Sequence, residues 1–152
     1  QTMIYADMQV KAIKHISKWG QVHGYTKIDN DHILSVDGAS LCVIPDEYFI
    51  LDEDRLGNTI NDPAIVAGVV EAADDAIDIK LTDRQRVYNG RSYAIFDNEG
   101  TDIYIDVAVL KAFGRRCRYG INRVNRVDVI YVYDDDIDVL IGAIASYVFL
   151  QA

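Results

Sequence analysis

The sequence offers few residues whose types and spacing could perform catalysis. His15, His23 and His32 lie at spacings of eight and nine, so no two of them form the i, i+4 pair that holds a metal on a helix. Structural or surface roles are the favoured interpretation of all three. The acidic run 134–138 lacks the glycine and the distal glutamate of a calcium loop, and it indicates a solvated hairpin turn.

The sequence contains no GxSxG, no HExxH and no phosphate-cradling glycine loop. We therefore predict a protein that is not an enzyme and that uses neither a metal nor a cofactor. An enzyme whose carboxylates converge only in space stays open as an alternative.

The two cysteines also argue against a metal site. Cys42 and Cys117 are 75 positions apart and form no CxxC pair. We expect both to be small buried apolar residues. This expectation suits a reducing compartment and, with no stretch of eighteen apolar residues in the chain, favours a cytoplasmic location.

Basic residues are concentrated in two short windows of an acidic chain. The net charge is −9, yet residues 11–18 and 111–126 contain no Asp or Glu, so the rest of the chain carries −18. A basic face without acidic neighbours is suited to phosphate groups, whose neutralisation gives a salt-dependent affinity. The residues that we predict to contact DNA are Lys11, Lys14, Lys18, Lys111, Arg115, Arg116, Arg118, Arg123 and Arg126.

Each window is expected to contribute an amphipathic helix. At about 100° per residue, Lys11, Lys14 and Lys18 share one stripe, and Lys111, Arg115 and Arg118 share another. The apolar residues on the opposite sides are expected to pack on a sheet. They are Val10, Ile13 and Ile16 in the first helix, and Val109, Leu110, Phe113 and Cys117 in the second.

A weak internal repeat relates the two windows. Ile-Tyr-Ala-Asp at 4–7 recurs as Ile-Tyr-Ile-Asp at 103–106, and Lys-Ala-Ile at 11–13 recurs as Lys-Ala-Phe at 111–113. The repeat predicts one domain, 1–152, with half-repeats at about 3–50 and 77–150 and an acidic connector at about 51–76. Each half should open with a short strand, at 3–5 or 101–105, followed by a helix that Asp7 or Asp106 caps and that Gly20 or Gly120 ends.

Short strands bounded by turn residues are expected after each helix. Asn89-Gly90 is the strongest hairpin signal, because both turn positions need positive φ. A helix over 63–73 should begin at Pro63, with Asp62 at its cap. The predicted fold class is α+β, with antiparallel sheets and two helices on one side. The predicted strands are 25–28, 32–36, 41–44, 77–81, 84–88, 91–96, 127–133 and 139–145.

This layout resembles the DNA sliding clamp family, on the repeated Ile-Tyr-x-Asp and Lys-Ala-(Ile/Phe) openings and on the two basic stripes. The resemblance implies a DNA-clamp-like domain whose paired helices face duplex DNA inside an acidic body. It departs from the family in size, because the chain has room for one such domain and a ring would need several identical chains.

The sequence thus predicts a non-catalytic, clamp-like accessory protein that binds duplex DNA through two basic helices. The alternative is a protein-interaction or self-assembly domain with no DNA role, whose basic face docks an acidic protein or another copy of the chain in a homo-oligomer. Tyr147 and Phe149 could form an exposed patch for such self-association.

Overall fold

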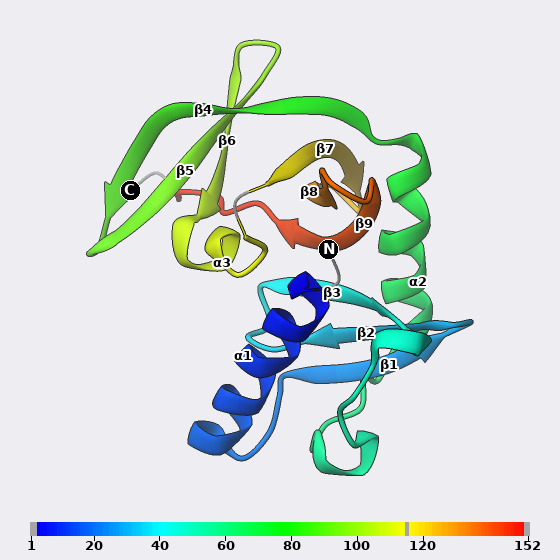
Figure 1. Cartoon of the computed structure of the whole chain (residues 1–152). Helices are drawn as coiled ribbons and strands as arrows, with labels where there is room; N and C mark the ends of the chain where they lie inside the picture. Colours follow the sequence, from blue (N-terminus) through cyan, green and yellow to red (C-terminus); the bar gives the residue numbers. More distant parts are fainter. Residues whose placement is uncertain (1–2, 115, 151–152) are drawn as a thin grey trace.

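The computed structural model describes residues 3–114 and 116–150, and antiparallel strands dominate it (Figure 1). Strands account for 45% of the chain and helices for 28%. The helices are α1 (Met3–Trp19), α2 (Pro63–Glu71) and α3 (Val107–Lys111), with 3-10 turns η1 (Asp46–Tyr48), η2 (Glu53–Arg55) and η3 (Ala72–Asp75). The strands are β1 (Gly24–Ile28), β2 (Asp31–Ser35), β3 (Ser40–Pro45), β4 (Ile77–Tyr88), β5 (Arg91–Asn98), β6 (Thr101–Asp106), β7 (Cys117–Val124), β8 (Val127–Asp134) and β9 (Val139–Ala145).

The strands form one nine-stranded sheet in the order β1-β2-β3-β9-β8-β7-β4-β5-β6, and neighbouring strands are antiparallel. Residues 40–42 pair with 142–144, so strands from the two ends of the chain meet inside the sheet. β4 pairs with β7 through residues 77–79 and with β5 from Lys80 onward. A register shift between Leu81 and Gln85 accompanies this change of partner, and such irregularities bend a strand.

The predicted α+β fold with two basic helices is wrong, because the structure is mostly one large antiparallel sheet with few helices. α3 has only five residues. The chain leaves the helical conformation at Gly114, whose φ is +88°, and then enters β7. Eight register pairs with β8 hold residues 117–124, so the last part of the expected helix, up to Gly120, lies inside a strand. Tertiary pairing overrides the weak helical pattern here.

The prediction for the start of the first half-repeat is also wrong. Residues 3–5 belong to α1 instead of a strand, and Asp7 lies inside that helix instead of capping it. In the second half-repeat the predicted opening strand and helix cap are confirmed. Residues 101–105 are in β6, and the Asp106 carboxylate accepts a hydrogen bond from the Ala108 amide at 2.9 Å.

Local turn chemistry was predicted well. Asn89 and Gly90 have φ of +48° and +77°, as a tight hairpin between β4 and β5 requires. α1 ends at Trp19, directly before Gly20, whose φ is +85°, and α2 begins at Pro63. Asp62 precedes α2, but its side chain makes no capping hydrogen bond. The predicted strands 77–81 and 84–88 are one continuous strand, β4.

Helices pack on both faces of the sheet. The larger core joins α1 and α3 to one face, where Met8, Leu110 and Phe113 pack with Ile130 and Ile141. On the other face, α2 and η3 cover a smaller core of Val129, Tyr131 and Ala143. Tyr131 fixes α2 there by donating its hydroxyl to the Val69 carbonyl at 2.6 Å. Within residues 3–114 and 116–150, no helix has the length and apolar character that crossing a membrane requires.

Candidate nucleic-acid interface

The orientation of α1 is fixed by a buried glutamine. Gln9 donates from Nε2 to the carbonyls of Tyr5, at 3.0 Å, and Tyr48, at 2.8 Å, while its Oε1 accepts from the Ile50 amide at 2.7 Å. These bonds tie the helix to the segment that follows β3. Tyr5, Met8 and Ala12 are buried with Gln9, so this face of α1 packs against the body. The rotation of α1 about its axis is therefore fixed, and so is the direction in which each unburied side of the helix faces.

The predicted packing face of α1 is wrong. Val10 and Ile13, which were expected to pack on the sheet, are exposed, whereas Ile16 packs partly against the core. Tyr5, Met8, Ala12 and Ile16 form a second apolar stripe with helical spacing, and the structure buries this stripe instead. The helix consequently has a buried face, a basic face and an exposed apolar face.

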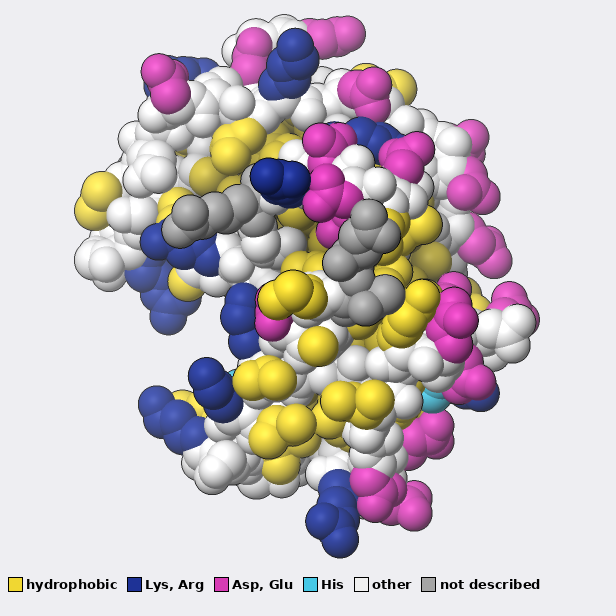
Figure 2. Space-filling model, in the orientation of Figure 1, with side chains coloured by type: hydrophobic (Ala, Val, Ile, Leu, Met, Phe, Trp, Pro, Cys, Tyr) yellow, Lys and Arg dark blue, Asp and Glu magenta, His cyan; other side chains and the backbone are white. Residues whose placement is uncertain are grey.

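The basic face of α1 lines a groove of about 350 Å³. Lys11, Lys14 and Lys18 all contribute to its wall, so the structure brings the three predicted residues of the first window together. The opposite wall comes from the β2–β3 connection and β3, through Asp37, Ser40 and Cys42 among others. Figure 2 shows Lys and Arg side chains on both sides of the hollow between the regions of α1 and α3.

Lys11, in the first basic window, contacts the backbone of the second window. Its Nζ donates to the carbonyl of Ala112 at 3.1 Å and approaches that of Lys111 at 3.5 Å, at the end of α3. A lysine ammonium satisfies helix-terminal carbonyls in this way. Lys111, the second window's own lysine, is exposed beside this contact. Lys11 therefore has a structural role, and Lys14 and Lys18 are the cations of the groove that are available to a ligand.

Lys14 and Lys18 have no carboxylate partner within 4.0 Å among the residues that the structure describes. Trp19 borders the same groove, with the Lys18 Nζ 5.1 Å from the centre of its ring. The His15 ring lies 6.3 Å from that of Trp19. An exposed indole beside two free ammonium groups can bind a phosphate and stack on a flat ring.

Sequence reasoning missed Trp19 as a site residue. The signal that could have found it is its position four residues after His15 and directly after Lys18, at the end of the basic stripe. It is the single tryptophan of the chain. Its fluorescence therefore reports on this end of α1, where the groove lies.

The second basic window does not form the predicted helical stripe. Arg118 is in β7, where alternation places it on the face opposite Ile121, a residue of the α1-side core. Its guanidinium lies over the ring of Tyr133 and donates to Asp138 at 2.7 and 2.9 Å, and this carboxylate raises the arginine's pKa. Arg118 is thus neutralised and is on the other side of the sheet from the lysine groove.

The other described arginines of this window lie outside the lysine groove. Arg116 lies 3.7 Å from the Asp136 carboxylate and Arg123 lies 3.9 Å from that of Asp128. Arg126 is in the turn between β7 and β8, with φ of +67°. Arg115 lies outside the described residues. Of the eight predicted DNA contacts that the structure describes, only the three lysines of α1 line the groove.

A buried histidine forms a second polar cluster. The His32 Nε2 donates to the Asp46 Oδ1 at 2.7 Å, and its Nδ1 faces the Tyr25 hydroxyl at hydrogen-bond distance. The imidazole stacks on Phe49 with ring centres 3.8 Å apart. Burial raises the pKa of Tyr25, whereas the bond from His32 lowers the pKa of Asp46. The cluster ties the chain after β3 to the β1–β2 hairpin, as expected for a structural histidine.

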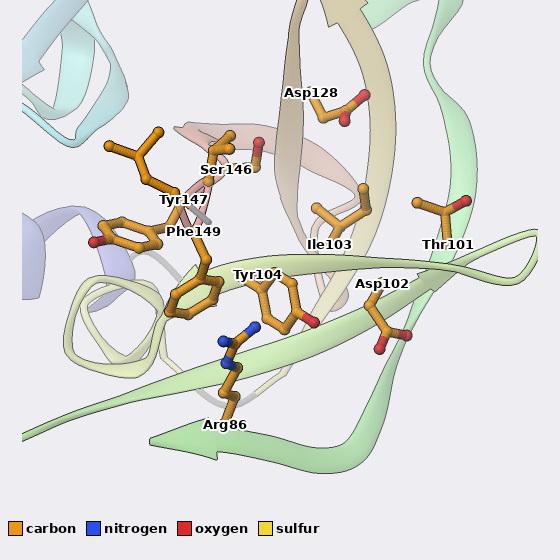
Figure 3. Close-up of a pocket in the computed structure, with 11 residues that line it drawn as sticks. Arg86, Thr101, Asp102, Ile103, Tyr104, Asp128, Ser146, Tyr147 and Phe149 are labelled. Atoms are coloured by element: carbon orange, nitrogen blue, oxygen red, sulfur yellow. The ribbon is translucent and has the colours of Figure 1, made fainter. Parts of the chain in front are cut away.

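A cavity of about 720 Å³ lies beside the edge strand β6 and the C-terminal segment (Figure 3). The Arg86 guanidinium points toward Phe149 and Tyr104, 3.8 Å and 5.5 Å from their ring centres. Tyr147 donates its amide to the Tyr104 carbonyl at 2.8 Å. Tyr147 and Phe149, predicted as an exposed patch, thus pack with the strands, and Tyr147 remains partly exposed. No motif or spacing in the sequence singles out Arg86.

Neither thiol is activated for chemistry. Cys42 and Cys117 are free, and burial raises their pKa values to about 12 and about 11 respectively. Within the described ranges, no three His, Cys, Asp or Glu residues are placed to hold a metal ion. The Asp134 carboxylate accepts from the amides of Asp136 and Ile137, as in a hairpin turn.

No family model, curated protein or solved structure matches the chain. The resemblance to sliding clamps therefore stays a prediction, and the local geometry carries the functional interpretation.

Proposed function

We propose that this protein is a non-catalytic accessory protein that binds duplex DNA by contacting phosphates from the lysine groove of α1. The observation that carries the proposal is the convergence of Lys14 and Lys18 on one groove, without carboxylate partners among the described residues. Leaving two ammonium groups unpaired in a chain of net charge −9 favours an anionic ligand.

The groove is suited to a polyanion that follows the helix. Lys14 and Lys18 are one turn apart, so their Cα atoms are about 6 Å apart along the axis. Each phosphate that a lysine neutralises releases condensed counterion, which makes the affinity fall with salt. Trp19 is placed to contact the ligand beside Lys18.

Titration of Trp19 fluorescence with a duplex oligonucleotide at several salt concentrations tests the proposal. We expect quenching and a log–log salt slope that becomes shallower by about 1 for each lysine replaced. Lys14→Glu with Lys18→Glu should therefore weaken binding and reduce the slope by about 2.

Lys80→Glu with Arg55→Glu is the matched control, because it changes the net charge equally at exposed positions away from the groove. This control should retain the slope of the unmodified protein. Absence of duplex binding at low salt, or equal losses in the two double variants, contradicts the proposal. Stronger quenching by single-stranded DNA than by duplex would assign the groove to unpaired bases.

The alternative is a protein-interaction domain, and the cavity beside β6 supports it. Arg86, aromatic rings and residues of the edge strand β6 line this cavity, and edge strands with aromatic pockets are a recurrent mode of peptide binding. Failure of DNA binding with an intact fold would favour this function.

A further inference from the structure

A second space, the Trp19 hollow, continues the lysine groove past the end of α1. Its volume is about 340 Å³. The groove and the hollow share four lining residues, which are His15, Trp19, Val36 and Asp37. Three lysines line the groove, whereas no Lys or Arg of the described chain lines the hollow. The two spaces therefore suit different parts of one ligand.

Uncharged amide groups line the Trp19 hollow, from Gln21 and Asn58. The Asn58 Nδ2 donates to the Val22 carbonyl at 3.1 Å, which orients this amide. Neither the Asn58 Oδ1 nor the Gln21 side chain makes a hydrogen bond to a residue that the structure describes. Amide side chains hydrogen-bond the edges of nucleobases, so the hollow offers a base free donors and acceptors.

Asp37 places a fixed carboxylate where the groove and the hollow meet. Its Oδ1 accepts hydrogen bonds from the amides of Ala39, at 2.9 Å, and Ser40, at 3.3 Å. A carboxylate repels phosphate but accepts from the amino groups of nucleobases. The phosphates of a bound strand should therefore stay with the lysines, and the part of the strand that enters the hollow should be a base.

Trp19 supplies a stacking surface at the junction of the two spaces. The residue is 64% exposed. The Lys18 ammonium lies over one face of the indole, 5.1 Å from the ring centre, and leaves the rest of the ring accessible. Bases of any sequence stack on such rings. α1 ends at the periphery of the molecule, so a strand can reach this ring from outside (Figure 1).

We propose that the Trp19 hollow binds one unpaired nucleobase of the DNA whose phosphates the lysine groove contacts. This inference rests on the proposed function and names its substrate more closely, as duplex DNA that adjoins a single strand. Within an intact duplex, neighbouring base pairs cover the faces of each base. An unpaired nucleotide beside the duplex has a free ring that can stack on Trp19 and enter the hollow.

Three DNAs with the same duplex part test the proposal. One is blunt, one has a three-nucleotide overhang, and one has an overhang of equal length made of abasic nucleotides. The two overhangs carry the same phosphates, so a difference between them reports on the bases alone. We expect the overhang with bases to bind about tenfold more tightly than the abasic overhang, as expected for one stacked base. Fluorescence anisotropy of a dye at the far end of the duplex measures each affinity, for 5′ and for 3′ overhangs.

Variants of Trp19 assign this difference to the hollow. In Trp19→Ala the ratio of the two affinities should fall to about one, because the stacking surface is lost. Trp19→Phe should retain part of the ratio, since a phenyl ring can still stack. Tyr88→Ala is the matched control, because it removes an exposed aromatic ring that lines neither space, and it should leave the ratio unchanged. Far-UV circular dichroism verifies that the variants are folded.

Equal affinities for overhangs with and without bases, at both the 5′ and the 3′ end, overturn the proposal and leave duplex binding by the lysine groove intact. An unchanged ratio in Trp19→Ala, or an equal loss in Tyr88→Ala, also overturns it. Failure of all three DNAs to bind at low salt has a different meaning, because it contradicts the proposed function as well.

Discussion

At the scale of single residues, the Asp46 carboxylate makes the attachment of the segment after β3 to the sheet dependent on pH. Its carboxylate accepts from His32 at 2.7 Å and lies 3.5 Å from the Lys27 ammonium. These partners lower the pKa of Asp46, with the bond from His32 as the larger cause. A carboxylate with a lowered pKa stabilises the fold above its unfolded value of about 4, and this stabilisation is lost as the pH falls through the folded value.

We therefore expect Asp46→Asn to be less stable than the unmodified protein at neutral pH. The difference should begin to shrink as the pH falls below about 4, and it should vanish below the lowered folded pKa, where the carboxylate is protonated in both the folded and the unfolded protein. Urea denaturation at a series of pH values measures it. Asp54→Asn, at an exposed position of η2, is the control. A difference in the free energy of unfolding that stays constant down to pH 2 would show that the charge of Asp46 does not contribute to stability.

Residue roles were predictable only where they depend on local chemistry. Asp106 as a helix cap and Asn89-Gly90 as a hairpin turn follow from neighbouring residues alone. Two of the three partners of Gln9 are 39 and 41 residues away, and those of His32 are 7 and 14 residues away. No spacing rule connects such residues, because the folded sheet brings them together.

At the scale of elements, β9 passes so close to the segment after α3 that only glycine fits. A Cβ atom on Gly142 would collide with the buried Phe113 ring and lie 2.7 Å from the Leu41 carbonyl oxygen. Gly142→Ala should therefore destabilise the protein by about 1–3 kcal/mol, because either the ring or β3 must move. Chemical denaturation gives this free energy of unfolding.

Gly68→Ala provides the opposite result. Gly68 lies inside α2, and a Cβ atom there meets no other atom within 4 Å. Alanine loses less backbone entropy on folding, so this change should stabilise the protein by about 0.5–1 kcal/mol. Destabilisation by Gly68→Ala, or a neutral Gly142→Ala, would contradict the packing described for these elements.

The sequence predicted the positions of strands better than the lengths of helices. β1, β2, β3, β8 and β9 are within one or two residues of the expected ranges. Their alternating apolar residues lie between clear turn signals. The apolar residues after α3 are compatible with either a helix or a strand, and pairing with β8 makes this segment a strand. For α1, two apolar stripes compete, and the contacts of Gln9 with the body select the one that is buried.

At the scale of the whole molecule, one shared core joins the two ends of the chain. The cluster that contains Met8 of α1 also contains Phe96 of β5 and Ile144 of β9. β3 and β9 pair directly within the sheet. A small domain with one such core unfolds as a single cooperative unit.

Native-state hydrogen exchange should therefore give β3, β8 and β9 the same opening free energy, equal to that of global unfolding. Measurement at low denaturant by two-dimensional NMR resolves these amides. A lower opening free energy for α1 and β1–β3 than for β7–β9 would reveal two separately unfolding parts.

The two edge strands of the sheet also affect whether another molecule can extend the sheet. Ile60 donates its amide to the Tyr25 carbonyl at 2.9 Å on the β1 edge, and Tyr147 does the same to Tyr104 on the β6 edge. A strand from another molecule would have to displace one of these segments before extending the sheet. Fibre-like polymerisation is thereby hindered at both edges.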